Sequence, residues 1–141
     1  MTMELKTYSI QELSIGQCEC YNVKITEKAI LEFCQLTGDF HPLHSDLKYA
    51  RECGFKNIIA HGMLVTSYSS ALIGMRLPGQ NTIVIKEVFD YLHPVYPEDL
   101  ILISGVVESI EMRFKTVNIG VTIKVKNQIV AKGMYLAKIR E

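Results

Sequence analysis

The sequence predicts a single α+β domain in which a curled antiparallel sheet wraps around one long central helix. Two observations lead to this prediction. Residues 61–77, HGMLVTSYSSALIGMRL, form a long, largely apolar segment interrupted by serines, which is typical of a buried helix. From residue 81 onward, β-branched stretches dominate and apolar residues often alternate with polar ones, as they do in strands. The apolar face of such a sheet needs a cover, and the long helix provides it.

The N-terminal part of the chain is predicted to form one strand followed by helical pieces. Residues 17–25, QCECYNVKI, are expected to be a strand. Thr26 is a candidate N-cap for a helix over residues 27–37, and Gly38 follows where a left-handed glycine can end that helix. A short helix is expected at residues 46–51.

The C-terminal part is predicted to form long antiparallel strands at residues 82–92, 99–114, 117–125 and 129–139. The clearest of them has an apolar residue at every second position: Val117, Ile119, Val121, Ile123 and Val125. A curled antiparallel sheet around one central helix is the hot-dog architecture. Because no repeat or linker-like composition divides the chain, residues 1–141 are expected to be one hot-dog domain.

Composition and charge exclude several classes of protein. The chain is 48% hydrophobic and 21% charged, as soluble globular domains are. Fifteen basic residues balance fifteen acidic ones, which argues against a nucleic-acid partner. No apolar run approaches the ~18 residues of a membrane span, and the N-terminus lacks the apolar region of a signal peptide. The expectation is a cytoplasmic protein with no membrane partner.

The cysteines are expected to be free thiols. Cys18, Cys20, Cys34 and Cys53 include no C-x-x-C pair, and without a secretory signal disulfides are disfavoured. They are interpreted as small core or near-core residues.

The stretch TGDFHPLHSD, residues 37–46, places two carboxylates and two imidazoles within ten residues. Asp39 and His44 lie five positions apart around Pro42, so their side chains can converge, hold a water molecule and move its proton. A simpler alternative is that Asp39 caps the next helix and His44 packs under a loop. A metal site at Asp39, His41 and His44 is disfavoured, because Pro42 interrupts the histidine pair and no HExxH or cysteine pair accompanies it.

The second feature is the sequence Ala60-His61-Gly62-Met63, where the long helix is expected to begin. The first turn of a helix leaves backbone N–H groups unpaired at the positive end of the dipole. Glycine at position 62 permits close approach, so an N–H there can donate to an oxygen that gains negative charge. Alternatively, Gly62 only eases the chain into the helix, and His61 packs or caps.

Together the two features resemble the MaoC-like dehydratases and R-specific enoyl-CoA hydratases. Residues 33–50, FCQLTGDFHPLHSDLKYA, match the family signature [YF]-x-x-L-[ST]-G-D-x-N-P-L-H-x-D at most positions. The HGM at residues 61–63, opening a helix that ends in LPG, is similar to the same family. The resemblance extends from about residue 17 to the C-terminus.

The resemblance implies a hot-dog fold, usually dimeric, that reversibly hydrates 2-enoyl thioesters of coenzyme A or acyl carrier protein to (R)-3-hydroxyacyl thioesters. It implies that Asp39 and His44 are the catalytic dyad, that the backbone N–H of Gly62 forms the oxyanion hole, and that Ser70 orients the dyad. Neither a metal nor another cofactor is expected.

One position departs from the family signature, because His41 stands where the family has asparagine. A charged His41 would lower the pKa of both Asp39 and His44, which leaves the pH optimum open. Two alternative functions therefore remain: a hot-dog acyl-CoA thioesterase, and a non-catalytic acyl-CoA-binding or partner subunit.

Overall fold

The computed structural model describes residues 3–140. In chain order the elements are η1 (Ile10–Glu12), β1 (Cys18–Lys24), α1 (Glu27–Thr37), α2 (Pro42–Ser45), α3 (Leu47–Glu52), α4 (Gly62–Ala71), η2 (Leu72–Arg76), β2 (Thr82–Tyr91), β3 (Leu100–Glu111), β4 (Thr116–Val125) and β5 (Gln128–Ile139). No helix within residues 3–140 is long and apolar enough to cross a membrane.

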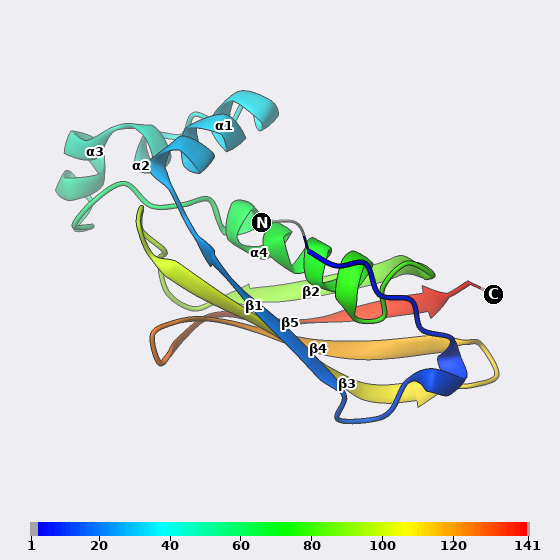
Figure 1. The fold of residues 1–141 in the computed structure, drawn as a ribbon. Helices are drawn as coiled ribbons and strands as arrows, with labels where there is room; N and C mark the ends of the chain where they lie inside the picture. The colour runs from blue at the N-terminus through cyan, green and yellow to red at the C-terminus, as the bar shows by residue number, and fades with distance from the viewer. Residues whose placement is uncertain (1–2, 141) are drawn as a thin grey trace.

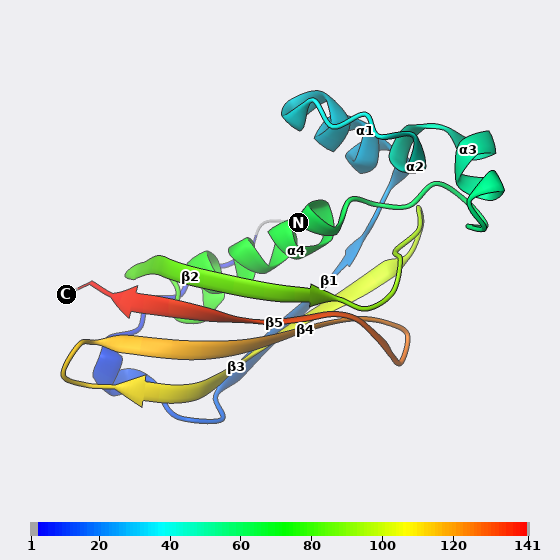
Figure 2. The same cartoon turned by 180° about the vertical axis from the view of Figure 1, so that it is seen from behind.

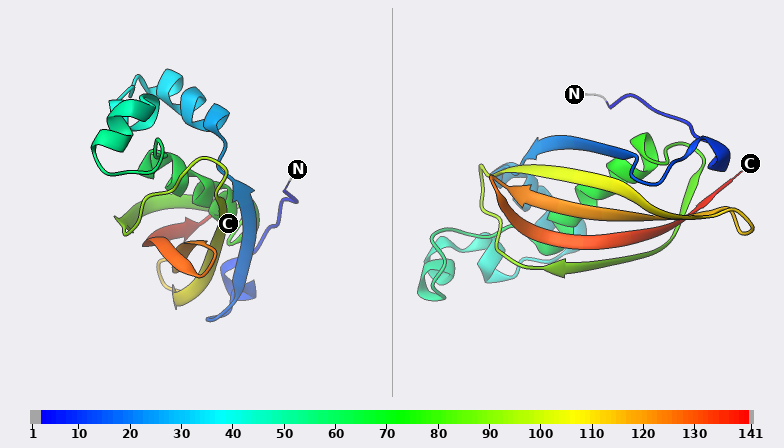
Figure 3. Two further views of the ribbon diagram at one scale, coloured as in Figure 1. Left: turned by 90° about the vertical axis from the view of Figure 1, so that its left-hand side faces the viewer. Right: turned by 90° about the horizontal axis from the view of Figure 1, so that it is seen from below.

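The five strands form one antiparallel sheet in the order β1-β3-β4-β5-β2. The sheet curls around α4, which runs along its inner face, while α1, α2 and α3 project beyond one end (Figures 1 and 3). The strand β2 lies at one edge of the sheet beside α4, as the view from behind shows (Figure 2). The prediction of a hot-dog fold is confirmed.

The helix boundaries follow from local chemistry. The Thr26 side chain accepts a hydrogen bond from the Ala29 amide at 3.0 Å, which caps α1. Gly38 ends α1 at φ 78°, a conformation that a side chain would strain. Asp46 accepts a hydrogen bond from the Tyr49 amide at 3.1 Å and so caps α3. The two boundaries of α1 agree with the sequence analysis, and α3 lies one residue beyond the range expected for the short helix.

The core lies between α4, η2 and the inner face of the sheet. Its members from β4 are the alternating residues Val117, Ile119, Val121 and Ile123. Gly105 of β3 passes directly under the helix, because an added Cβ would lie 2.7 Å from Leu72 Cδ2. Two hydroxyl groups of the sheet hold α4 in place. Tyr135 Oη lies 2.6 Å from Ser69 Oγ, and Tyr21 Oη donates to the carbonyl of Tyr68.

Three expectations were wrong in detail. The helix expected at residues 61–77 is not continuous, because α4 ends at Ala71 and the chain continues as a π-helical turn, η2. The strand expected at 99–114 ends at Glu111, where a turn to β4 begins. Of the cysteines, Cys34 is buried whereas the other three are exposed, so a near-core role is wrong for those three.

The edge strand β2 exposes a run of large apolar side chains. Ile83, Val84, Ile85 and Val88 are each 45–55% exposed. Beside them, Met63 on α4 is 71% exposed. Burying such side chains is favourable, at roughly 25 cal/mol per Å² of apolar surface. The face formed by β2 and α4 is therefore an apolar surface without a cover in the single chain.

Candidate active site

Asp39 lies on the turn between α1 and α2, and local hydrogen bonds determine its position. Its amide donates to Thr37 Oγ1 at 3.2 Å, and its Oδ1 accepts from the His41 amide at 3.1 Å. Pro42 occupies the first turn of α2, where its missing N–H costs nothing. The side chain of Asp39 is 51% exposed, so its carboxylate stays accessible to water.

His44 lies in the single turn of α2, and its ring is half-buried. Its Nδ1 lies 2.7 Å from the carbonyl oxygen of Ile59. Because a carbonyl can only accept, Nδ1 carries the hydrogen and Nε2 keeps its lone pair. Burial lowers the pKa of His44 below its ordinary value, and outweighs the hydrogen bond to Ile59, which raises it. The ring is therefore poised to accept a proton at Nε2.

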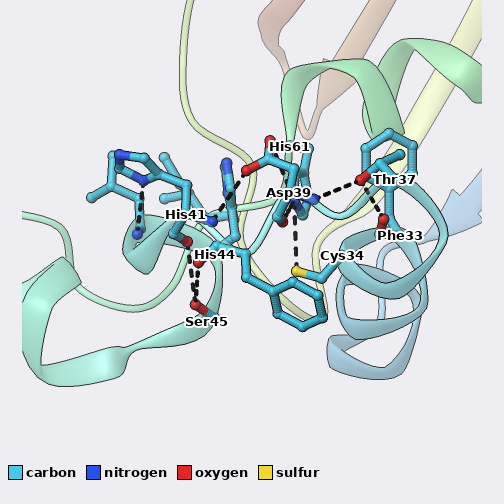
Figure 4. Close-up of polar contacts among 11 residues, drawn as sticks. Phe33, Cys34, Thr37, Asp39, His41, His44, Ser45 and His61 are labelled. Carbon is cyan, nitrogen blue, oxygen red and sulfur yellow. Dashed lines mark hydrogen bonds and ion pairs between the residues drawn. The ribbon is translucent and has the colours of Figure 1, made fainter.

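His61 is the N-cap residue of α4, and it is only 3% exposed. Its ring stacks on that of His44, with centroids 3.7 Å apart and planes 23° apart. Its Nε2 lies 3.1 Å from the carbonyl oxygen of Asp39 and 3.9 Å from Asp39 Oδ2. Cys34 Sγ approaches the same nitrogen at 3.6 Å, as Figure 4 shows. His61 thus connects the Asp39 turn with His44.

Gly62 begins α4, and the side chain of His61 makes no capping hydrogen bond to the first turn. The N–H groups of that turn are therefore left to other acceptors. The ring of Tyr91 lies against Gly62, because an added Cβ would be 2.6 Å from Tyr91 Cε1. Tyr91 Oη in turn lies 3.3 Å from Thr66 Oγ1. Only glycine leaves both the helix start and this ring undisturbed.

A cavity of about 450 Å³, here called the apolar cavity, joins His44 to the start of α4 but is not lined by Asp39 or His61. His44 and Gly62 both line it, and the rest of its wall is mainly apolar, with Phe55, Val65, Leu92, Val95 and Val130. A second depression of about 660 Å³, the edge groove, lies between α4 and β2. Met63 and Tyr91 line both and therefore separate them.

The sequence model of the MaoC-like domain family matches residues 16–136. The chain belongs to this family.

Several proteins of named activity are similar to this chain. It is 27% identical over 139 residues to a 3-hydroxybutyryl-CoA dehydratase from Methylorubrum extorquens, a match that covers 99% of this chain and 88% of the relative. It is 30% identical over 130 residues to an (R)-specific enoyl-CoA hydratase from Rhodospirillum rubrum, a match that covers 92% of this chain and 90% of that relative.

Solved structures agree with these matches. The unliganded R-hydratase PhaJ1 from Pseudomonas aeruginosa has a TM-score of 0.88 and 29% identity, over 94% of this chain and 86% of the other. The (R)-hydratase from Aeromonas caviae also has a TM-score of 0.88, with 26% identity over 92% of this chain and 98% of the other.

The MaoC-like site brings together Asp39 and His44, as the sequence predicted, but adds His61 to them. One ligand-type atom from each of these three side chains lies within 4.8 Å of the others. His41 does not join them. Its Nδ1 accepts a hydrogen bond from the Leu43 amide at 3.2 Å, and its ring centroid is 5.9 Å from that of His44. The trio considered from the sequence as metal ligands is therefore not the one that the fold assembles.

The observed trio is also poorly arranged for one metal ion. Lone pairs of imidazole nitrogens lie in the ring plane, and Zn²⁺ binds them at ~2.0–2.1 Å. The planes of His44 and His61 are stacked at 3.7 Å, so one ion at that distance from both nitrogens would lie out of at least one plane. The arrangement suits an acid–base site better than a metal centre.

Ser70 lies near the end of α4. It is eight residues beyond Gly62 on α4 and η2 follows soon after, which places it about 12 Å along the helix. It lines the edge groove rather than the apolar cavity. Its role in orienting the dyad stays a prediction. His61, by contrast, was regarded from sequence only as a packing or capping residue.

Proposed function

We propose that this MaoC-like protein reversibly hydrates a 2-enoyl thioester, of coenzyme A or acyl carrier protein, to the (R)-3-hydroxyacyl thioester. One observation supports this most strongly. The Asp39 and His44 side chains lie within 4.8 Å of each other, a separation that one water molecule can bridge, and His44 shares the apolar cavity with the start of α4. The hydratase and dehydratase names of the relatives agree with the proposal.

In the proposed hydration, a water molecule lies between the Asp39 carboxylate and His44 Nε2. Asp39 accepts one O–H of the water and orients it, while Nε2 takes the other proton as a C–O bond forms at the β-carbon. The electrons of the double bond move onto the thioester oxygen, and the Gly62 N–H stabilises the negative charge there. The His44 imidazolium then returns its proton to the α-carbon, which restores the carbonyl and the neutral ring.

Crotonyl-CoA tests this proposal directly. Purified protein is expected to remove the enoyl-thioester absorbance, whereas Asp39→Asn and His44→Gln each lower kcat/KM by about 10²–10⁴-fold. Asp46→Asn is the matched control. It makes the same chemical change seven positions away, and asparagine still caps α3. Turnover that survives both dyad substitutions would refute the dyad, and release of free thiol would instead assign a thioesterase.

We also propose that the apolar face of β2 and α4 is covered by a second copy of the chain. The exposed side chains of β2 listed above lie on an edge strand, whose outer backbone groups are free to pair. Light scattering after gel filtration is expected to give twice the mass of one chain for the wild type. Under the same conditions, Val88→Lys is expected to shift the measured mass toward that of one chain. A wild type that stays monomeric would refute the interface.

A further inference from the structure

We infer that His61 is a positioning residue for the proposed dyad: it fixes the backbone of Asp39 through its N–H and supports the catalytic ring of His44 by stacking. This inference rests on the proposed function, although one of its tests does not depend on activity. Three separate observations support it.

The first observation is that His61 is buried although one of its ring nitrogens makes no hydrogen bond to the described residues. The side chain is 3% exposed, and its Nδ1 has no hydrogen-bond partner among the described residues. Burying a polar group without a partner costs about 1–3 kcal/mol. An apolar side chain of the same shape would avoid that cost, so packing alone does not explain a histidine here.

The second observation is the contact with the Asp39 turn. Because the Asp39 carbonyl is only an acceptor, His61 Nε2 at 3.1 Å must carry the hydrogen and donate it. This bond joins the turn after α1 to the start of α4, two segments that are 22 residues apart in the chain. Figure 4 shows Asp39 and His61 in contact, and this bond fixes the Asp39 turn relative to the start of α4.

The third observation is the stack of the two rings. His61 covers one face of His44 at 3.7 Å, and Phe33 packs on His61 with ring centroids 4.7 Å apart. The stack keeps water from one face of His44, and burial is the largest cause of its lowered pKa. Among the described residues, the other titratable groups around the two rings are Cys34 and Asp39, which contact His61, and His41, whose ring faces His44; His93 lines the same cavity as His44.

Two substitutions separate the two roles of His61. His61→Phe keeps a flat ring against His44 but removes the N–H that donates to the Asp39 carbonyl. It also removes the unpartnered nitrogen, so the fold is expected to tolerate it. His61→Asn keeps an N–H donor but removes the ring, which opens His44 to water.

The readouts are steady-state hydration of crotonyl-CoA across pH, and the titration of the His44 ring followed by NMR. With His61→Phe, kcat is expected to fall at least tenfold with little change in KM, while the pKa of His44 rises less than in His61→Asn, because only the charge of His61 is lost and the ring cover is kept. With His61→Asn, the pKa of His44 is expected to rise toward its ordinary value, and the acid limb of kcat/KM shifts to higher pH.

Val117→Ala is the control for loss of core packing. It removes buried methyl groups near the start of β4, at the opposite end of the sheet from α1–α3 (Figure 1). Its expected effect is a lower melting temperature with unchanged kcat and an unchanged pH profile. If Val117→Ala reproduces the kinetic changes, or if both His61 variants behave as the wild type in kcat and in His44 titration, the inference is wrong.

The proposed function and this inference fail separately. A wild type that does not hydrate crotonyl-CoA refutes the proposed function, but the NMR titration still applies. In that case a pKa of His44 that is no higher in His61→Asn than in His61→Phe overturns the stacking role, and a higher one supports it.

Discussion

The start of α4 offers a sharp test of the proposed oxyanion hole through Gly62→Ala. An added Cβ would lie 2.6 Å from Tyr91 Cε1 and 2.9 Å from Cδ1 and Cζ. Carbon atoms in ordinary contact are ~3.5–4.0 Å apart, so the ring must retreat by about 1 Å. Tyr91 is 53% exposed and can move, but its contact with Thr66 Oγ1 would break.

Stability is expected to change little in this variant. Alanine favours a helix over glycine by up to ~1 kcal/mol, and the lost hydrogen bond costs about the same amount. Activity is expected to fall much more, because a misplacement of about 1 Å near the reacting atoms can cost ~10²-fold. Tyr91 also borders both the apolar cavity and the edge groove, so its retreat changes the shape of the site.

The assay is hydration of crotonyl-CoA by the wild type, Gly62→Ala, Tyr91→Ala and the double variant, with melting temperatures measured for each. The double variant is expected to recover most of the kcat/KM lost in Gly62→Ala, relative to Tyr91→Ala alone. Full activity in Gly62→Ala would refute the importance of this helix start. A double variant as weak as Gly62→Ala would show that the loss does not depend on Tyr91.

Four further predictions concern charge. Since burial lowers the pKa of His44, the acid limb of kcat/KM should lie below pH ~6.5, the ordinary value for histidine. The free energy of unfolding should also fall as the pH drops from ~6.5 through the lowered pKa of His44, because His44 binds a proton more readily in the unfolded chain than in the folded one. Urea titrations at several pH values check this. His41→Asn removes a group whose positive charge lowers the pKa of His44, and asparagine can still cap α2. The acid limb of kcat/KM should therefore move to higher pH, and an unchanged acid limb would contradict this. Glu19→Ala removes the hydrogen-bond acceptor of Lys6 and Arg76. It should therefore lower the free energy of unfolding by ~1–2 kcal/mol in urea titrations and leave kcat unchanged. An unchanged free energy of unfolding would show that the ion pairs contribute nothing.

The parts of the fold that local chemistry determines were predictable from the sequence. The cap at Thr26, the left-handed Gly38 and the alternation of β4 all depend on residues within a few positions of each other. The π-helical turn of η2 was not predictable, because the apolar pattern of residues 61–77 is equally compatible with an uninterrupted α-helix. The placement of β1 beside β3, and of β2 beside β5, depends on pairings between distant segments.

The candidate site divides in the same way. Asp39 and His44 were predictable because they share one short turn, and Pro42 limits the paths between them. His61 was not, because its contacts with Phe33, Cys34 and Asp39 span more than twenty residues of sequence. One feature of the sequence could have indicated His61: it stands at the start of a strongly apolar helix. A polar side chain is costly to bury there, so a histidine at this position suggests a functional role.

The arrangement of the site explains how one short motif can act with a distant helix start. The Asp39 turn extends beyond the sheet with α1–α3, whereas Gly62 begins a helix that the sheet encloses (Figure 1). Without a connection, movement of the projecting helices would change the distance between the dyad and the N–H groups of α4. Two hydrogen bonds from side chains cross this junction, from His61 to the Asp39 carbonyl and from His44 Nδ1 to the Ile59 carbonyl, and the Ile59 amide adds a backbone bond to the Leu43 carbonyl. Because the side-chain bonds end on backbone carbonyls, they leave Asp39 Oδ2 and His44 Nε2 to a water molecule, so the junction can be held together without using the atoms of the proposed chemistry.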